Sequence, residues 1–145
     1  YAGFQSDKRV TDFVVPQTTG NGTDFATLTN DHRNCFTGGS LTRIIVAGGV
    51  STYPTESMEY NSVASSSGWS DFGDLSANSG QAMGGSVSSS TRMVIAGGTR
   101  DNFVITADMW YLEIATTGNA VDFGDLTTAK RGHEARNPSS ASVTG

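Results

Sequence analysis

The sequence predicts an all-β fold built from about three copies of one four-stranded antiparallel unit. Three observations predict it: a repeated sequence, short apolar runs rich in β-branched residues, and turn-forming residues at regular intervals. The chain of 145 residues contains 18 glycines, and only 16% of its residues are charged. Such a composition offers little from which to build long amphipathic helices.

An internal repeat sets the length of the unit. The segment TRIIVAGG, ending at Gly48-Gly49, returns as TRMVIAGG, ending at Gly97-Gly98, an offset of 98 − 49 = 49 residues. The segment DFGDL at 71–75 returns at 122–126, and the turn TTGN at 18–21 returns at 116–119. Because these markers keep one order, we expect repeats at 1–43, 44–92 and 93–145, all in one domain.

Each unit is expected to contain four strands, described here for the unit that begins in the middle copy and continues into the third. A small, polar first strand at 81–87 is followed by an apolar second strand at 93–96, which the glycine pair Gly97-Gly98 ends. After a variable loop, an aromatic third strand runs over 109–114. The TTGN turn then forms a hairpin with the fourth strand, which carries DFGDL.

Four strands in about 45–51 residues are typical of a propeller blade, whereas a β-solenoid has a period of about half this length. Three blades are fewer than the roughly four to eight of a closed propeller. We therefore expect the chain to be a slice of a longer repeat protein, in preference to one of several copies that close a ring.

The repeat resembles the kelch repeat, in which a buried strand ending in Gly-Gly is followed by an aromatic residue. Here Tyr60 follows Gly48-Gly49 and Tyr111 follows Gly97-Gly98, while the usual kelch tryptophan is matched only by Trp69. Residues 88–98 and 114–127 are more similar still to kelch-like virion structural proteins of tailed bacteriophages of aquatic bacteria. The resemblance implies a kelch-like β-propeller fragment of about three four-stranded antiparallel blades.

The same resemblance implies a non-enzymatic structural protein of the virion, an extracellular particle, in a tail, fibre or capsid appendage. Its partners would be other virion proteins or further blades, and a glycan or receptor on the host surface. The alternative is a cellular kelch-type adaptor that binds another protein. The formal charge of −5 argues against a nucleic-acid partner, and no apolar run is long enough for a membrane span.

No residue pattern predicts catalysis, a cofactor or a metal. The DFG motif lacks the other motifs of a protein kinase, so Phe72 and Phe123 are expected in the blade core, with Asp74 and Asp125 accepting backbone hydrogen bonds. The repeated aspartates lie on separate blades and should not converge on calcium. His32 and His133 are expected to be polar residues at equivalent blade ends.

Recognition is expected in the loops after the glycine pairs, because these loops vary most between copies. Tyrosine, arginine and phenylalanine there are of the types that dominate binding surfaces. The candidate recognition residues are Tyr53, Glu56, Arg100, Asp101, Asn102 and Phe103. The single cysteine, Cys35, cannot form an internal disulfide and is expected to act as a small apolar residue in a strand.

Overall fold

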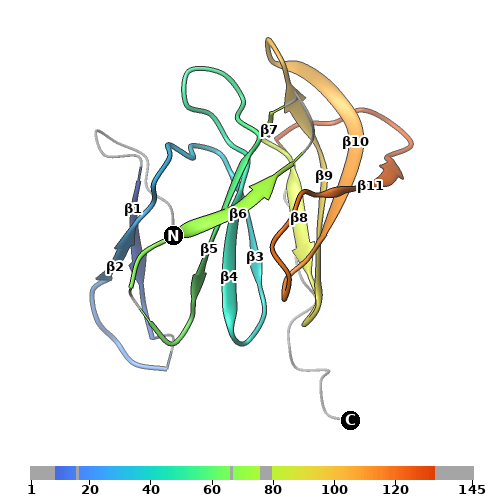
Figure 1. Cartoon of the computed structure of the whole chain (residues 1–145). Coiled ribbons are helices and arrows are strands. Elements are labelled where there is room, and N and C mark those ends of the chain that lie inside the picture. The colour runs from blue at the N-terminus through green and yellow to red at the C-terminus, as the bar shows by residue number, and fades with distance from the viewer. Residues whose placement is uncertain (1–8, 16, 66, 76–79, 133–145) are drawn as a thin grey trace.

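The computed structural model describes residues 9–15, 17–65, 67–75 and 80–132. Within these residues the chain forms eleven strands and no helix, in sheets that stand side by side (Figure 1). The prediction of an all-β fold is therefore confirmed. The strands are β1 (Val10–Phe13), β2 (Thr23–Thr27), β3 (Phe36–Gly39), β4 (Arg43–Ala47), β5 (Ser57–Ser62), β6 (Ser70–Asp74), β7 (Gln81–Ala82), β8 (Gly85–Ser88), β9 (Arg92–Arg100), β10 (Val104–Glu113) and β11 (Val121–Asp125).

The strands form three antiparallel sheets, and the second and third begin before the repeat bounds expected at 44 and 93, since β3 starts at Phe36 and β7 at Gln81. The first sheet contains β1 and β2, and the second has the order β3-β4-β5-β6. In the third, the order is β11-β10-β9-β7, with β8 also paired to β9. The register repeats as well, since Phe36 pairs with Ala47 and Gly85 pairs with Ala96, each 49 residues further along.

Two boundaries of the third repeat differ from the prediction. The expected first strand at 81–87 is interrupted at Met83, whose φ of 61° lies in the left-handed region, and so becomes β7 and β8. The glycine pair does not end the second strand, because β9 continues through Gly97-Gly98 and pairs with β10 as far as Arg100. In the second repeat the prediction is correct, since β4 ends at Ala47, directly before Gly48-Gly49.

Backbone hydrogen bonds join successive sheets at the same offset. Met83 N donates to Asn34 O at 3.0 Å, and Gly132 N donates to Met83 O at 2.7 Å. All three residues have φ between 53° and 65°, so one left-handed position recurs in each repeat. The first strands β3 and β8 lie against each other. Successive repeats are therefore stacked with equivalent elements in contact.

The main core lies between the second and third sheets, where Phe36, Ile45, Met58 and Phe72 of the second sheet are buried with Met93, Ile95, Leu112 and Ile114 of the third. The prediction for Phe72 is confirmed, since this side chain is 2% exposed. Its repeat equivalent Phe123 is 49% exposed, so the prediction for that residue is wrong. The third repeat covers Phe72, whereas no described segment covers Phe123.

Candidate functional site

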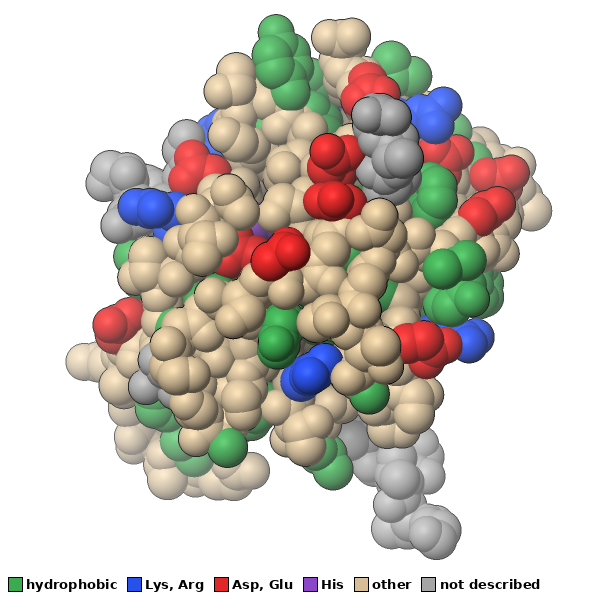
Figure 2. All heavy atoms as spheres, viewed as in Figure 1, with side chains coloured by type: hydrophobic (Ala, Val, Ile, Leu, Met, Phe, Trp, Pro, Cys, Tyr) green, Lys and Arg blue, Asp and Glu red, His purple; other side chains and the backbone are tan. Residues whose placement is uncertain are grey.

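The predicted recognition residues lie at one end of the sheets, where each second strand connects to the third (upper end of Figure 1). In the second sheet this connection is a loop in which Tyr53 is 60% exposed. In the third it is a tight hairpin between β9 and β10, with Phe103 37% exposed. Acidic side chains also gather in the upper half of this face (Figure 2). An aromatic ring therefore projects from each of two neighbouring sheets.

The tip of the β9–β10 hairpin has an unusual backbone. Asn102 and Phe103 have φ values of 52° and 61°, and Val104 N donates to Asp101 O at 3.2 Å. Two left-handed residues inside such a turn define the type I′ hairpin, which normally takes Asn-Gly. Phenylalanine is strained in this conformation, and such strain is common at functional sites. Val104 and Ile105 next to it are exposed, so the tip is apolar.

The charged candidate residues are less accessible to a binding partner than the aromatic ones. The guanidinium of Arg100 is paired with the carboxylate of Asp108 at 2.7 Å. Glu56 is only partly exposed, and its carbonyl oxygen accepts a hydrogen bond from Leu75 N at 2.8 Å. The exposed surface at this end of the sheets is therefore formed mainly by the side chains of Tyr53 and Phe103. Asp101 and Asn102 are exposed beside Phe103.

A buried acid–histidine pair that was not predicted lies beneath this end of the second sheet. His32 Nδ1 lies 2.6 Å from Gly48 O, and His32 Nε2 lies 3.1 Å from Glu59 Oε1. Both ring nitrogens thus face acceptors. The backbone N–H groups of Thr29 and Asn30 also donate to the Glu59 carboxylate, each at 2.8 Å.

Burial raises the pKa of Glu59, but the hydrogen bonds from His32, Thr29 and Asn30 outweigh it and hold the pKa at about 2. The Glu59 carboxylate is therefore ionised at neutral pH. Both side chains are inaccessible to solvent, so the pair cannot meet a substrate and acts as a structural link between the first and second sheets.

The equivalent positions of the third sheet carry a different arrangement, in which glutamine replaces the histidine and the carboxylate of Asp108 pairs with Arg100. Gln81, 49 residues after His32, donates to Gly97 O, and Asp108 stands 49 residues after Glu59. Gly49 N donates to Gln81 O and Gly98 N donates to Lys130 O, so Lys130 is the next equivalent residue. His133, which was expected at a nearly equivalent place to His32, lies outside the described residues.

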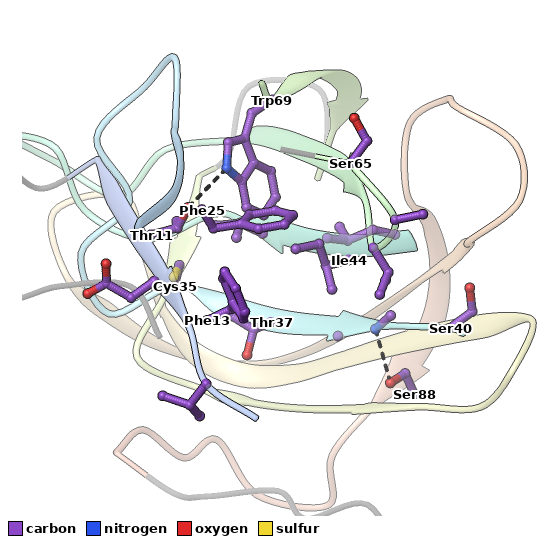
Figure 3. Close-up of a pocket in the computed structure, with 18 of the residues that line it drawn as sticks. Thr11, Phe13, Phe25, Cys35, Thr37, Ser40, Ile44, Ser65, Trp69 and Ser88 are labelled. Carbon is purple, nitrogen blue, oxygen red and sulfur yellow. Dashed lines mark hydrogen bonds between the residues drawn. The ribbon is translucent and has the colours of Figure 1, made fainter. Parts of the chain in front are cut away.

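An aromatic groove lies between the first and second sheets and was not predicted. It has a volume of about 1180 Å³, larger than the roughly 300–1,000 Å³ of small-molecule pockets. Phe13, Phe25 and Trp69 face one another across it (Figure 3). Phe13 and Phe25 are in edge-to-face contact at 6.2 Å, and Trp69 Nε1 donates to Thr11 Oγ1 at 3.3 Å.

The groove lies where the described parts of the first two repeats differ. The second sheet has the strands β3, β4, β5 and β6, whereas the described part of the first repeat has only β1 and β2. Cys35, just before β3, lines the groove and is partly buried. Burial raises the pKa of its thiol to about 11, so it is protonated at neutral pH and is a poor nucleophile.

Metal ligands do not converge in the described residues, which contain no group of three or more His, Cys, Asp or Glu side chains placed to hold an ion. Of the repeated aspartates, Asp122 Oδ1 accepts a hydrogen bond from Gly124 N at 2.9 Å. No helix in the described part of the chain is long and apolar enough to cross a membrane.

Comparison with known proteins gives no family for the chain. No protein-family model matches it, and no curated protein matches it significantly.

Proposed function

We propose that the chain is part of a kelch-like β-propeller that serves as a non-enzymatic structural module of a tailed-phage virion and binds the host surface. The observation that carries the binding role is the pair of exposed aromatic tips, Tyr53 and Phe103, at one end of neighbouring sheets. The phage assignment is supported by the resemblance of the repeats at 88–98 and 114–127.

The propeller arrangement is supported by the contacts between sheets. Successive first strands lie against each other, and equivalent backbone groups are joined at a 49-residue offset. Ser86 Oγ also donates to Thr37 O at 2.9 Å, linking β8 to β3. Units that use the same contacts in the same direction accumulate a constant rotation, which is how blades are placed around an axis.

A surface glycan is the ligand class that fits the loop end best. An aromatic ring has an apolar face that can stack on a sugar ring, and carboxylates accept hydrogen bonds from sugar hydroxyls. Tyr53 and Phe103 supply the rings, and Asp101 stands beside Phe103. The rigid hairpin reduces the entropy lost when the ligand is bound.

The test is binding of the purified chain to an array of bacterial surface polysaccharides. Tyr53→Ala and Phe103→Gly should each weaken binding at least about tenfold, since each removes a ring from the contact. Leu41→Ala is the matched control, because Leu41 is almost fully exposed in the turn at the opposite end of β4 and should have no effect. Equal binding by all variants would refute the loop end as the recognition surface.

The virion assignment needs a separate measurement. Mass spectrometry of purified particles should detect peptides of this chain, and particles that lack the propeller should adsorb more slowly to host cells. Unchanged adsorption would leave an architectural role without attachment. Absence of the peptides from particles would refute the virion assignment altogether.

A further inference from the structure

The second and third sheets are joined by a contact between two of the repeated motifs. The TTGN turn at 116–119, between β10 and β11, lies on the edge of β6, which carries the DFGD motif at 71–74. Gly118 N donates to Phe72 O at 2.7 Å, and Ala120 N donates to Asp74 O at 2.8 Å. Asp74 N donates in turn to the side-chain oxygen of Asn119 at 3.0 Å.

The close approach depends on a glycine in the edge strand. A Cβ atom at Gly73 would lie 2.6 Å from the carbonyl carbon and oxygen of Gly118, which is closer than real Cβ contacts come. Gly73 also has a φ of 132°, which other residues rarely adopt. The DFGD edge is therefore shaped to receive this turn, and Phe72 becomes buried when the third repeat covers it.

The first and second sheets meet without this pair of motifs. Ala26 of β2 occupies the position equivalent to Gly73 of β6, so the edge strand of the first sheet carries a Cβ atom at this position. The turn of the second sheet has the sequence Gly68-Trp69, and a Cβ at Gly68 would meet nothing within 4 Å. Trp69 fills the contact instead, packed with Phe25 and Ala26. The contact between the first and second sheets therefore has neither a TTGN turn nor a DFGD edge.

Each of these motifs occurs once more in the chain, and neither copy is in contact with the other motif. The second DFGD edge is β11, where Phe123 is 49% exposed and Val121 is also exposed. Gly124 has a φ of 119°, close to that of Gly73, but a Cβ there would meet nothing within 4 Å. The second TTGN turn, at 18–21, is exposed, and a Cβ at Gly20 would also meet nothing within 4 Å.

We propose that the turn at 18–22 of one copy of the chain docks on the β11 edge of a second copy. By analogy with the contact seen within the chain, Gly20 N and Gly22 N would donate to Phe123 O and Asp125 O. Asn21 would accept a hydrogen bond from Asp125 N, as Asn119 does from Asp74 N. Docking also buries Phe123, and this burial supplies the apolar part of the interface.

Such a contact joins different surfaces of the two copies, so it is head-to-tail. Head-to-tail contacts close a ring when the rotation permits and otherwise extend a filament. The inference goes beyond the proposed function, because it needs neither a ligand nor a virion.

The first test is sedimentation velocity of the purified chain from micromolar to millimolar concentration. The wild-type chain should associate as concentration rises, and Asn21→Ala should weaken association about five- to tenfold by removing one hydrogen bond. Asn119→Ala is the matched control, because it removes the same bond inside the chain and should lower stability but leave association unchanged. A chain that stays monomeric, or an Asn21→Ala variant that associates like the wild type, would overturn the proposal.

The second test identifies the surfaces in contact. Chains with Asn21→Cys and chains with Asp125→Cys, both with Cys35→Ser, are mixed and treated with a short bismaleimide crosslinker. The mixture should give a crosslinked dimer that neither chain gives alone. A single chain with Asp74→Cys and Asn119→Cys is the positive control, since these residues are already in contact. Crosslinking in the control without a mixed dimer would overturn the proposal.

Discussion

Replacing Glu59 by glutamine should destabilise the protein strongly without changing its shape. The carboxylate of Glu59 accepts hydrogen bonds from Thr29 N and Asn30 N and faces His32 Nε2, so both of its oxygens are occupied by donors. A glutamine would place an NH₂ group against at least one backbone N–H, and it would remove the negative charge that these donors face. Breaking a buried, hydrogen-bonded pair of this kind costs about 2–4 kcal/mol of unfolding free energy.

The pH dependence gives an independent measure of the same interaction. The pKa of Glu59 falls from 4.5 to about 2 on folding. A lowered pKa contributes stability that is complete above pH 4.5 and is lost as the pH falls through the folded value. At about 1.4 kcal/mol for each pH unit, the contribution is about 3 kcal/mol. The wild type should therefore lose most of its advantage over Glu59→Gln between pH 4.5 and pH 2.

Urea unfolding followed by the fluorescence of the buried Trp69 would measure both effects. The control is Glu113→Gln, which removes a carboxylate paired with Arg92 at 2.6 Å on the surface. Because both partners of that pair are about half exposed, its loss should cost under about 1 kcal/mol. The reasoning would be refuted by a Glu59→Gln variant as stable as the control, or by a stability difference that stays constant as the pH falls.

Three further predictions concern single side chains. Phe72→Ala should lower the free energy of unfolding in urea by about 3–5 kcal/mol, whereas Phe123→Ala in the identical motif should lower it by under about 1 kcal/mol. Equal losses would contradict the assigned burial. Phe103→Gly should stabilise the isolated chain by about 0.5–1 kcal/mol in thermal unfolding, because glycine adopts the left-handed backbone conformation without strain. A loss of stability would show that the ring packs inward. Since the pKa of the Cys35 thiol is raised to about 11, its alkylation at pH 8 should be slow and should accelerate in urea, and fast labelling of the folded chain would refute this.

The sequence repeat predicted the strand order but not the burial of equivalent residues. A four-strand unit, a second strand rich in branched apolar residues and DFGD on the fourth strand all follow from local sequence, and the structure has them. Phe72 and Phe123 lie in identical motifs and yet differ in exposure. Burial depends on whether a neighbouring repeat is present, and this is a property of the stack and not of the motif.

The His32–Glu59 pair and the aromatic groove escaped prediction for a related reason. His32 and Glu59 are 27 residues apart and belong to different repeats, so no short motif contains both. The repeat offset could have indicated them, because Gln81 and Asp108 keep polar residues at the equivalent positions. The groove is lined by residues of both the first and the second repeat, so no single motif contains it.

The β9–β10 hairpin is the strongest reason to place function at the loop end. β4 ends before its glycine pair, whereas β9 continues through the equivalent pair to Arg100, so this hairpin is an extension of the common repeat. The extension requires an irregularity in β10 between Thr106 and Met109 and a left-handed Phe103, and its apolar tip is exposed. The base of the hairpin belongs to the sheet, since β7 pairs with β9 at Thr99 and Arg100 and Thr99 is buried. The exposed tip with its left-handed Phe103, and not the base, is therefore the part that we propose contacts a partner.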